Sequence, residues 1–125
     1  MIIHLHRLPD PALNPNKRLH FYKVAAAKRN AKEEIMWRAI EQVKKPYYPF
    51  KKAHIIITWV AKDNRRRDVD NLFASMKPYI DGLVTHGILT DDSADLVSYI
   101  LSYEKGDSFD TIIKIYNEGY FYGKY

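Results

Sequence analysis

The stretch from His20 to Lys44 repeats its apolar residues at helical spacing, and this feature most limits what the chain can fold into. The repeating positions are Val24, Ala27, Ala31, Ile35, Ala39 and Val43. Lys and Arg residues fill the other side of the repeat, as expected for a helix with one buried face. Because Pro46 and Pro49 follow, the helix is predicted to end before them.

Strand patterns surround this helix. Residues Ala53 to Ala61 are rich in β-branched and aromatic side chains, and a strand here would place Ile55, Ile57 and Trp59 on one face. A short first strand is predicted at Ile2–Arg7, and two later strands at about Leu96–Glu104 and Thr111–Asn117. The sequence Lys-Gly-Asp from 105 to 107 separates the last two and predicts a hairpin turn.

A second helix is predicted after the polar loop at residues 62–67. Its buried stripe would contain Leu72 or Phe73, Met76, Ile80 and Leu83, and Gly87 would end it. Pro78 lies inside this pattern, so it either kinks the helix or begins a new one. Residues 8–17 contain three prolines and predict an irregular loop. The order β-α-β-α-β-β favours a single α+β domain over residues 1–125, with a mixed sheet and two main helices.

Length and composition exclude several classes of protein. The chain has 125 residues, which suits one domain, and no cysteine, which excludes disulfides, thiolate metal sites and a Cys nucleophile. No apolar run approaches the roughly 20 residues of a membrane-spanning helix, so no membrane partner is expected. The start Met-Ile-Ile-His-Leu-His-Arg is unlike a signal peptide, and a cytoplasmic location is expected. The net charge of +5 makes nucleic acid a candidate partner.

The densest chemical pattern joins arginines to acids. Arg65, Arg66 and Arg67 precede Asp68 and Asp70, and an acidic pair follows about twenty residues later at positions 91 and 92. Asp68 and Asp70 would project from one side of an extended segment, or they would cap and begin a helix. Any one acid taken alone is more often a cap or a turn residue.

Taken together, the acids predict a metal site. The turn at Gly87 would bring the pair at 91 and 92 back towards Asp68 and Asp70. Three clustered carboxylates repel one another unless a cation is present. Their hard oxygen atoms suit Mg²⁺ or Mn²⁺, and such an ion activates water for attack on a phosphodiester. Lys77 lies two helical turns after Asp70, where its ammonium would contact a phosphate, or it would pair with Asp81 on the surface.

These residues resemble the RusA family of Holliday junction resolvases. The resemblance rests on Arg-Arg-Arg-Asp-Val-Asp-Asn-Leu from residue 65, Lys-Pro-Tyr-Ile-Asp-Gly-Leu from residue 77 and Gly-Ile-Leu-Thr-Asp-Asp from residue 87. It is close from Ile55 to Ser93, and looser at Leu-Asn-Pro-Asn from residue 13 and in the closing strands. Family members are small Mg²⁺-dependent endodeoxyribonucleases of phages, prophages and bacteria, and they act as dimers in DNA recombination and repair.

The resemblance implies a role for each matching residue. Asp68, Asp70 and Asp92 would be catalytic carboxylates and ligands of Mg²⁺, for which Mn²⁺ would substitute. Lys77 matches the catalytic lysine of the family. The spacing from the Asp-Asn pair to this lysine is longer here than in the best-known member, so Lys77 is aligned by its distance to Asp81. Asp91 is the neighbour that could be confused with Asp92, and only the resemblance selects Asp92. The expected partners are a four-way DNA junction and a second copy of the chain.

Further basic residues are candidates for DNA binding: Arg65, Arg66, Arg67, Lys51, Lys52, Lys17 and Arg18. The segment from Lys44 to Lys52 mixes lysines with aromatic residues. These residues would bind DNA by phosphate contacts and base stacking, or the lysines would be solvated and the aromatic residues would belong to the core. His4 and His6 alternate on a predicted strand, where structural roles are commoner than metal binding; the same holds for His20, His54 and His86. The Tyr-rich tail 120–125 would contact a partner copy or DNA, or fray.

Two other functions fit the same pattern. In a non-catalytic basic DNA-binding module, the acids would serve only as caps and turn residues. In a nuclease of the same chemistry, the substrate would be a flap or a fork.

Overall fold

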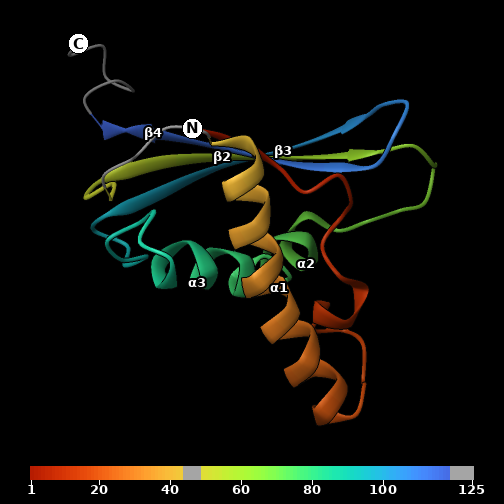
Figure 1. Cartoon of the computed structure of the whole chain (residues 1–125). Coiled ribbons are helices and arrows are strands. Elements are labelled where there is room, and N and C mark those ends of the chain that lie inside the picture. Colours follow the sequence, from red (N-terminus) through yellow and green to blue (C-terminus); the bar gives the residue numbers. More distant parts are fainter. Residues whose placement is uncertain (44–48, 119–125) are drawn as a thin grey trace.

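A four-stranded mixed sheet carries all the helices on one of its faces (Figure 1). The computed structural model describes residues 1–43 and 49–118. The strands are β1 (Ile2–His4), β2 (Ala53–Ala61), β3 (Val97–Lys105) and β4 (Asp110–Asn117), in the order β1-β4-β2-β3. β2 is parallel to β3 and antiparallel to β4, and β4 is antiparallel to β1. The predicted α+β fold with a mixed sheet is confirmed.

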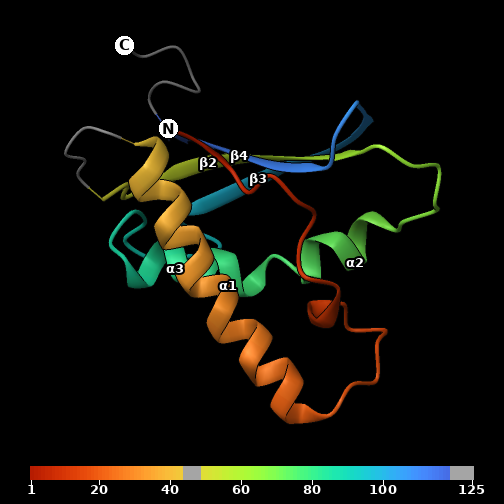
Figure 2. The ribbon, with the colours of Figure 1, turned by 45° about the vertical axis from the view of Figure 1, so that its right-hand side comes forward.

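The helices are η1 (Pro11–Leu13, a 3-10 turn), α1 (Phe21–Gln42), α2 (Val69–Ala74) and α3 (Lys77–Thr85). α1 crosses the sheet obliquely, and its first half projects away from the strands (Figures 1 and 2). None of the helices in the described ranges is long and apolar enough to cross a membrane.

The core forms between the sheet and the helices, as the two periodicities predict. Ile55, Ile57 and Trp59 of β2 are fully buried on the face that the sequence indicated. From α1, the small residues Ala27, Ala31 and Ala39 join Ile35 in the same core. Small residues on this face let the helix lie close to its neighbours.

Gly82 of α3 lies at a close approach of α3 to α1. A Cβ atom at this position would lie 2.5 Å from Cγ2 of Ile35 and 3.1 Å from the backbone of Lys32. Ile35 is fully buried and β-branched, so its methyl group has little freedom to move away. The absence of a side chain at position 82 therefore sets the distance between the two helices.

Gly82→Ala is expected to lower the free energy of unfolding by about 1 to 3 kcal/mol. The destabilisation from the steric clash is larger than the stabilisation that the higher helix propensity of alanine provides. Urea denaturation followed by circular dichroism measures the change. In an Ile35→Ala background, which removes the obstructing methyl group, the same substitution should cost less. An equal cost in both backgrounds would contradict this account of the helix contact.

Two local expectations need correction. β1 ends at His4 rather than at Arg7, because His6 has a φ of 60° and turns the chain. β3 and β4 do not form a hairpin, since β2 lies between them. The chain after β3 crosses the end of β2 at Gly106, whose N–H donates to the carbonyl oxygen of Ala61 at 3.0 Å. A Cβ atom on Gly106 would lie 2.5 Å from Cγ1 of Val60, so a glycine suits this crossing.

The second predicted helix is two helices. α2 ends at Ala74, and Pro78 stands in the first turn of α3, where its missing N–H costs no hydrogen bond. The alternative in which Pro78 begins a new helix is therefore the correct one. Gly87, with a φ of 77°, follows the end of α3 as predicted.

Candidate functional site

Lys77, at the start of α3, lies between two carboxylates. Its Nζ is 2.8 Å from Oδ1 of Asp81 and 2.6 Å from Oδ2 of Asp92. The two acids raise the pKa of Lys77 above its ordinary value, Asp81 contributing most. In return, Lys77 lowers the pKa of Asp92. We call Lys77, Asp81 and Asp92 the acid–lysine cluster; it is the strongest charged contact among the residues predicted to act in catalysis.

Asp91 and Asp92 have different environments. The side chain of Asp92 is 25% exposed and bonds to Lys77, whereas Asp91 is exposed. Oδ1 of Asp91 accepts a hydrogen bond from the backbone N–H of Asp92 at 2.8 Å, which supports the turn. Asp92 is thus the member of the pair that faces the cluster.

Tyr99 of β3 adds a group that the sequence did not single out. Its half-buried ring packs edge-on against Phe73 of α2, with 4.9 Å between the ring centroids. Burial, followed by the nearby charge of Asp92, raises the pKa of Tyr99 to about 12. The phenol therefore stays neutral near the acid–lysine cluster. Only the fold brings Tyr99 there, since a tyrosine in a strand carries no signal of this kind.

Asp68 and Asp70 lie at the start of α2, which is the helix-start alternative of the two considered. Asp68 occupies the N-cap position with extended backbone angles, but its side chain makes no capping hydrogen bond. Oδ1 of Asp70 accepts from the backbone N–H of Asn71 at 3.0 Å. Both acids are exposed, and the one charged contact of Asp68 within residues 1–43 and 49–118 is a long one of 3.5 Å with Arg66. The carboxylates are open to solvent and to a ligand.

The described residues contain no group of three His, Asp or Glu side chains placed to hold a metal ion. The expectation that Asp68, Asp70 and Asp92 would already be clustered is therefore not met in this conformation. The expectation that Asp70 and Lys77 share one face of a continuous helix is also wrong, because α2 ends at Ala74 and a separate helix, α3, begins at Lys77. Lys77 instead leans towards Asp81, four residues further along α3.

A pocket of about 310 Å³ lies between the loop at residues 8–17 and the segment at residues 65–75. Its charged lining residues are Asp10, Lys17, Arg65, Arg66, Arg67 and Asp68. We call it the arginine pocket. Cations outnumber acids in its lining, so it is suited to an anionic ligand directly beside Asp68.

The loop wall of this pocket is anchored to the core. The backbone N–H of Asp10 donates to Oη of Tyr79 at 3.1 Å, and Tyr79 is fully buried in α3. Oδ1 of Asp10 accepts from the N–H of Ala12 at 2.9 Å and begins η1. The prolines and this cap hold the loop in an irregular path that still presents a defined surface.

The three arginines are not equivalent. Arg67 donates two hydrogen bonds to Asp63, at 2.6 and 3.0 Å, and a third to Oη of Tyr103 at 3.2 Å. Its side chain is only 17% exposed, whereas that of Arg66 is 91% exposed. Arg67 therefore ties its loop to β3, while Arg65 and Arg66 are the arginines open to a ligand.

Asp63→Asn is expected to destabilise the fold at neutral pH by an amount that shrinks in acid. Arg67 holds the pKa of Asp63 at about 2, below its ordinary 3.8. The stabilisation is complete above the ordinary value and is lost as the pH falls through about 2. Urea denaturation at pH 7 and from pH 4 to 2 tests this. Asp107→Asn, at an exposed acid on the neighbouring loop, is the control, and identical pH profiles for the two variants would refute the assignment.

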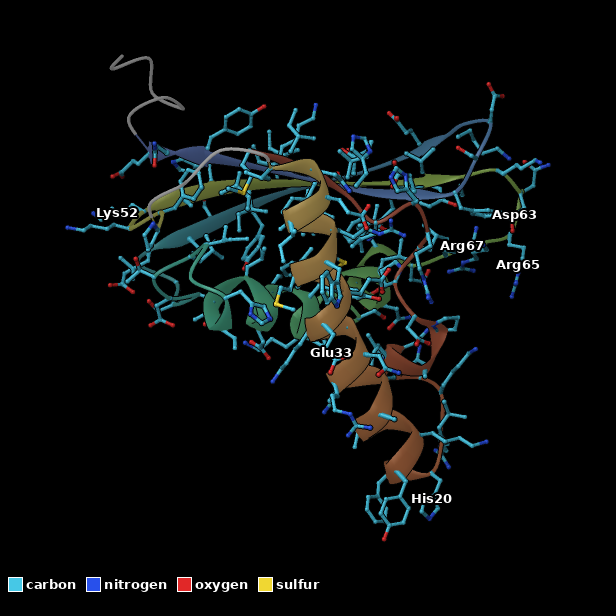
Figure 3. All side chains as sticks on the ribbon, in the orientation of Figure 1. His20, Glu33, Lys52, Asp63, Arg65 and Arg67 are labelled. Carbon is cyan, nitrogen blue, oxygen red and sulfur yellow. The ribbon has the colours of Figure 1, made fainter. Side chains whose placement is uncertain are left out.

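The remaining basic candidates are spread over the molecule. Lys17 lines the arginine pocket, and Arg18 is exposed in the loop before α1. Lys51 and Lys52 are exposed in the bend just before β2; Figure 3 shows Lys52 at the opposite end of the sheet from Arg65 and Arg67. They do not belong to the arginine pocket. The basic–aromatic residues at 44–48 and the tail at 120–125 lie outside the described residues.

The side chains of four histidines, His4, His6, His20 and His54, have structural partners. Nδ1 of His4 is 2.7 Å from Oδ2 of Asp110, and the rings of His4 and His6 stack with centroids 5.6 Å apart. The sequence did not indicate Asp110 as the partner of His4, because the two residues are far apart in the chain. Of the other histidines, His20 caps α1, His54 bonds to the hydroxyl of Ser98, and His86 is the C-cap residue of α3.

A comparison with protein-family models and with curated proteins found no match for the chain. The interpretation of the site therefore rests on the acid–lysine cluster, the open acids of α2 and the arginine pocket, together with the resemblance in motif.

Proposed function

We propose that this protein is a Mg²⁺-dependent endodeoxyribonuclease of the RusA type that resolves four-way DNA junctions. The observation that carries the proposal is the position of Asp68, which is open to solvent and lines a pocket whose other charged residues are mostly cationic. A phosphodiester needs cations for its charge and carboxylates for the metal ion that assists its cleavage. Both kinds of group border this one pocket.

Asp68, Asp70 and Asp92 are the residues that would hold the ion. Their carboxylate oxygens suit Mg²⁺, and Mn²⁺ accepts the same donors. Asp68 and Asp70 have no strong side-chain partner among the described residues, whereas Asp92 is bonded to Lys77. A bound ion would supply Lewis-acid stabilisation and would activate a water molecule.

Lys77 stabilises the charge of the reacting phosphate. Its ammonium carries a positive charge at neutral pH, and the ion pairs with Asp81 and Asp92, which raise its pKa further, hold it in place. Such a positioned cation acts most strongly where negative charge develops in the transition state. Arg65, Arg66 and Lys17 bind neighbouring phosphates through the arginine pocket, and these contacts position the strand without reading its sequence.

A four-way junction is resolved by nicks in two strands, which a symmetric dimer with two sites would make. We propose that the chain acts as a homodimer in DNA recombination and repair.

The test measures cleavage by the wild-type chain of three labelled DNAs of matched length: a four-way junction, a flap and a linear duplex. With Mg²⁺, we expect the junction to be cut and the duplex to remain intact, with no cleavage after addition of a chelator. Cleavage of the flap in preference to the junction would favour the flap or fork nuclease. Junction binding without cleavage of any DNA would favour the non-catalytic module.

A further inference from the structure

A second pocket lies between the first half of α1, the loop at residues 12–17 and the start of α3. It has a volume of about 490 Å³. It lies next to the tight contact at Gly82 and Lys32, on the side of the first half of α1, which projects away from the strands (Figure 2). The pocket thus follows from the way the helices cross.

Lysines dominate the charge of this pocket. Lys17, Lys28, Lys32 and Lys77 line it, and Asp81 is its single acid. Asp81 is already paired with Lys77. Within the described ranges, Lys17, Lys28 and Lys32 form no ion pair, so their charges are left for an external anion. We call this site the lysine pocket.

The lysine pocket is continuous in its lining with the other two parts of the site. Asn14 and Lys17 line both the lysine pocket and the arginine pocket. Lys77 lines the lysine pocket and also belongs to the acid–lysine cluster. The two pockets therefore meet at Asn14 and Lys17, where strands that leave a branch point in different directions can each enter one pocket.

The spacing of the lysines suits a nucleic-acid strand. Lys28 and Lys32 are one turn apart on α1, a rise of about 6 Å, and they face the same side. One strand of duplex DNA carries a phosphate every 3.4 Å or so along its axis, so the two ammonium groups can serve separate phosphates. Leu13, Val24 and Pro78 give the pocket an apolar part, which fits a sugar ring better than a free inorganic anion.

We propose that the lysine pocket binds the sugar–phosphate backbone of a second DNA arm, and that this interaction gives the protein its preference for branched over linear DNA. The inference deepens the proposed function, because the first arm is the one whose phosphates occupy the arginine pocket. A straight duplex follows one path, whereas a branch sends strands in two directions and can fill both pockets.

The test compares two double variants of α1 that each remove two positive charges. Lys28→Ala with Lys32→Ala empties the lysine pocket of two cations. Lys23→Ala with Arg29→Ala removes two exposed cations of the same helix that do not line either pocket. Binding to a four-way junction and to a duplex of equal length is measured over a range of salt concentrations with a chelator present, so cleavage does not enter the result. Circular dichroism checks that both variants fold.

We expect the pocket variant to bind the junction at least tenfold more weakly than the control variant. Its log–log salt slope should fall by about 0.9 for each phosphate that the variant no longer neutralises. Duplex binding should be equal for the two variants. Equal junction binding by both variants, or an equal loss of junction and duplex binding by the pocket variant, would overturn the proposal.

These outcomes separate the lysine pocket from the proposed function. A wild-type chain that shows the expected binding but never cleaves DNA with Mg²⁺ would refute the nuclease and leave the pocket standing. A chain that cleaves junctions while both variants bind them alike would refute the pocket alone. A wild-type chain that binds no DNA would refute both.

Discussion

Asp70→Asn is expected to reduce Mg²⁺-dependent cleavage of a four-way junction by at least about a hundredfold, with junction binding kept or tightened. The substitution keeps the shape of the side chain and an oxygen that can accept the N–H of Asn71, so the start of α2 should persist. It removes one of the negative charges that would attract and bind the cation, and leaves only a weaker, neutral oxygen donor. Because the substitution also removes a negative charge that faces phosphate, the affinity for DNA should not fall.

Single-turnover cleavage of a labelled junction measures the effect, and a binding assay with a chelator measures affinity separately. Asp107→Asn, which removes an exposed acid outside the acid–lysine cluster and both pockets, should cleave at the wild-type rate. Equal cleavage by wild type and Asp70→Asn would exclude a role for this carboxylate.

The second large effect separates Asp92 from Asp91. Asp92→Asn should abolish cleavage, again by at least about a hundredfold, because it removes a charged ligand and one of the two carboxylates that hold Lys77. Asp91→Asn should keep activity within about tenfold of wild type. The asparagine oxygen can still accept the N–H of the next residue, as Oδ1 of Asp91 does at 2.8 Å.

Both variants are assayed at single turnover, with circular dichroism to establish that they fold. The opposite result, an inactive Asp91→Asn beside an active Asp92→Asn, would mean that the motif is assigned one residue out of register in this turn.

Local patterns predicted the elements whose stability comes from burying one face. α1 and β2 occupy the places that their periods of 3.6 and 2 indicated, because Ile35 and Ile55 reach the core only in those conformations. The pairing of the strands in the sheet was harder to predict. The turn residues after β3 specify a change of direction, but not that β2 would insert between β3 and β4.

The residues of the candidate site also divide into those that a local pattern could predict and those that it could not. The motif indicated Asp92 and Lys77, and the fold places them 2.6 Å apart. The contacts of Arg67 with Tyr103 and of His4 with Asp110 join residues far apart in sequence, so no local pattern could predict them. The break between α2 and α3 was one of two alternatives for Pro78, and it decides which way Lys77 leans.

The proposed nuclease activity on branched DNA is tested by mapping the incisions that the wild-type chain makes in a four-way junction. The strands of the junction carry different labels, and the reaction contains either Mg²⁺ or a chelator. We expect Mg²⁺-dependent nicks at symmetric positions in two opposing strands, and no cutting of the matched duplex. A protein that binds the junction but leaves every strand intact at all Mg²⁺ and Mn²⁺ concentrations would contradict the proposal.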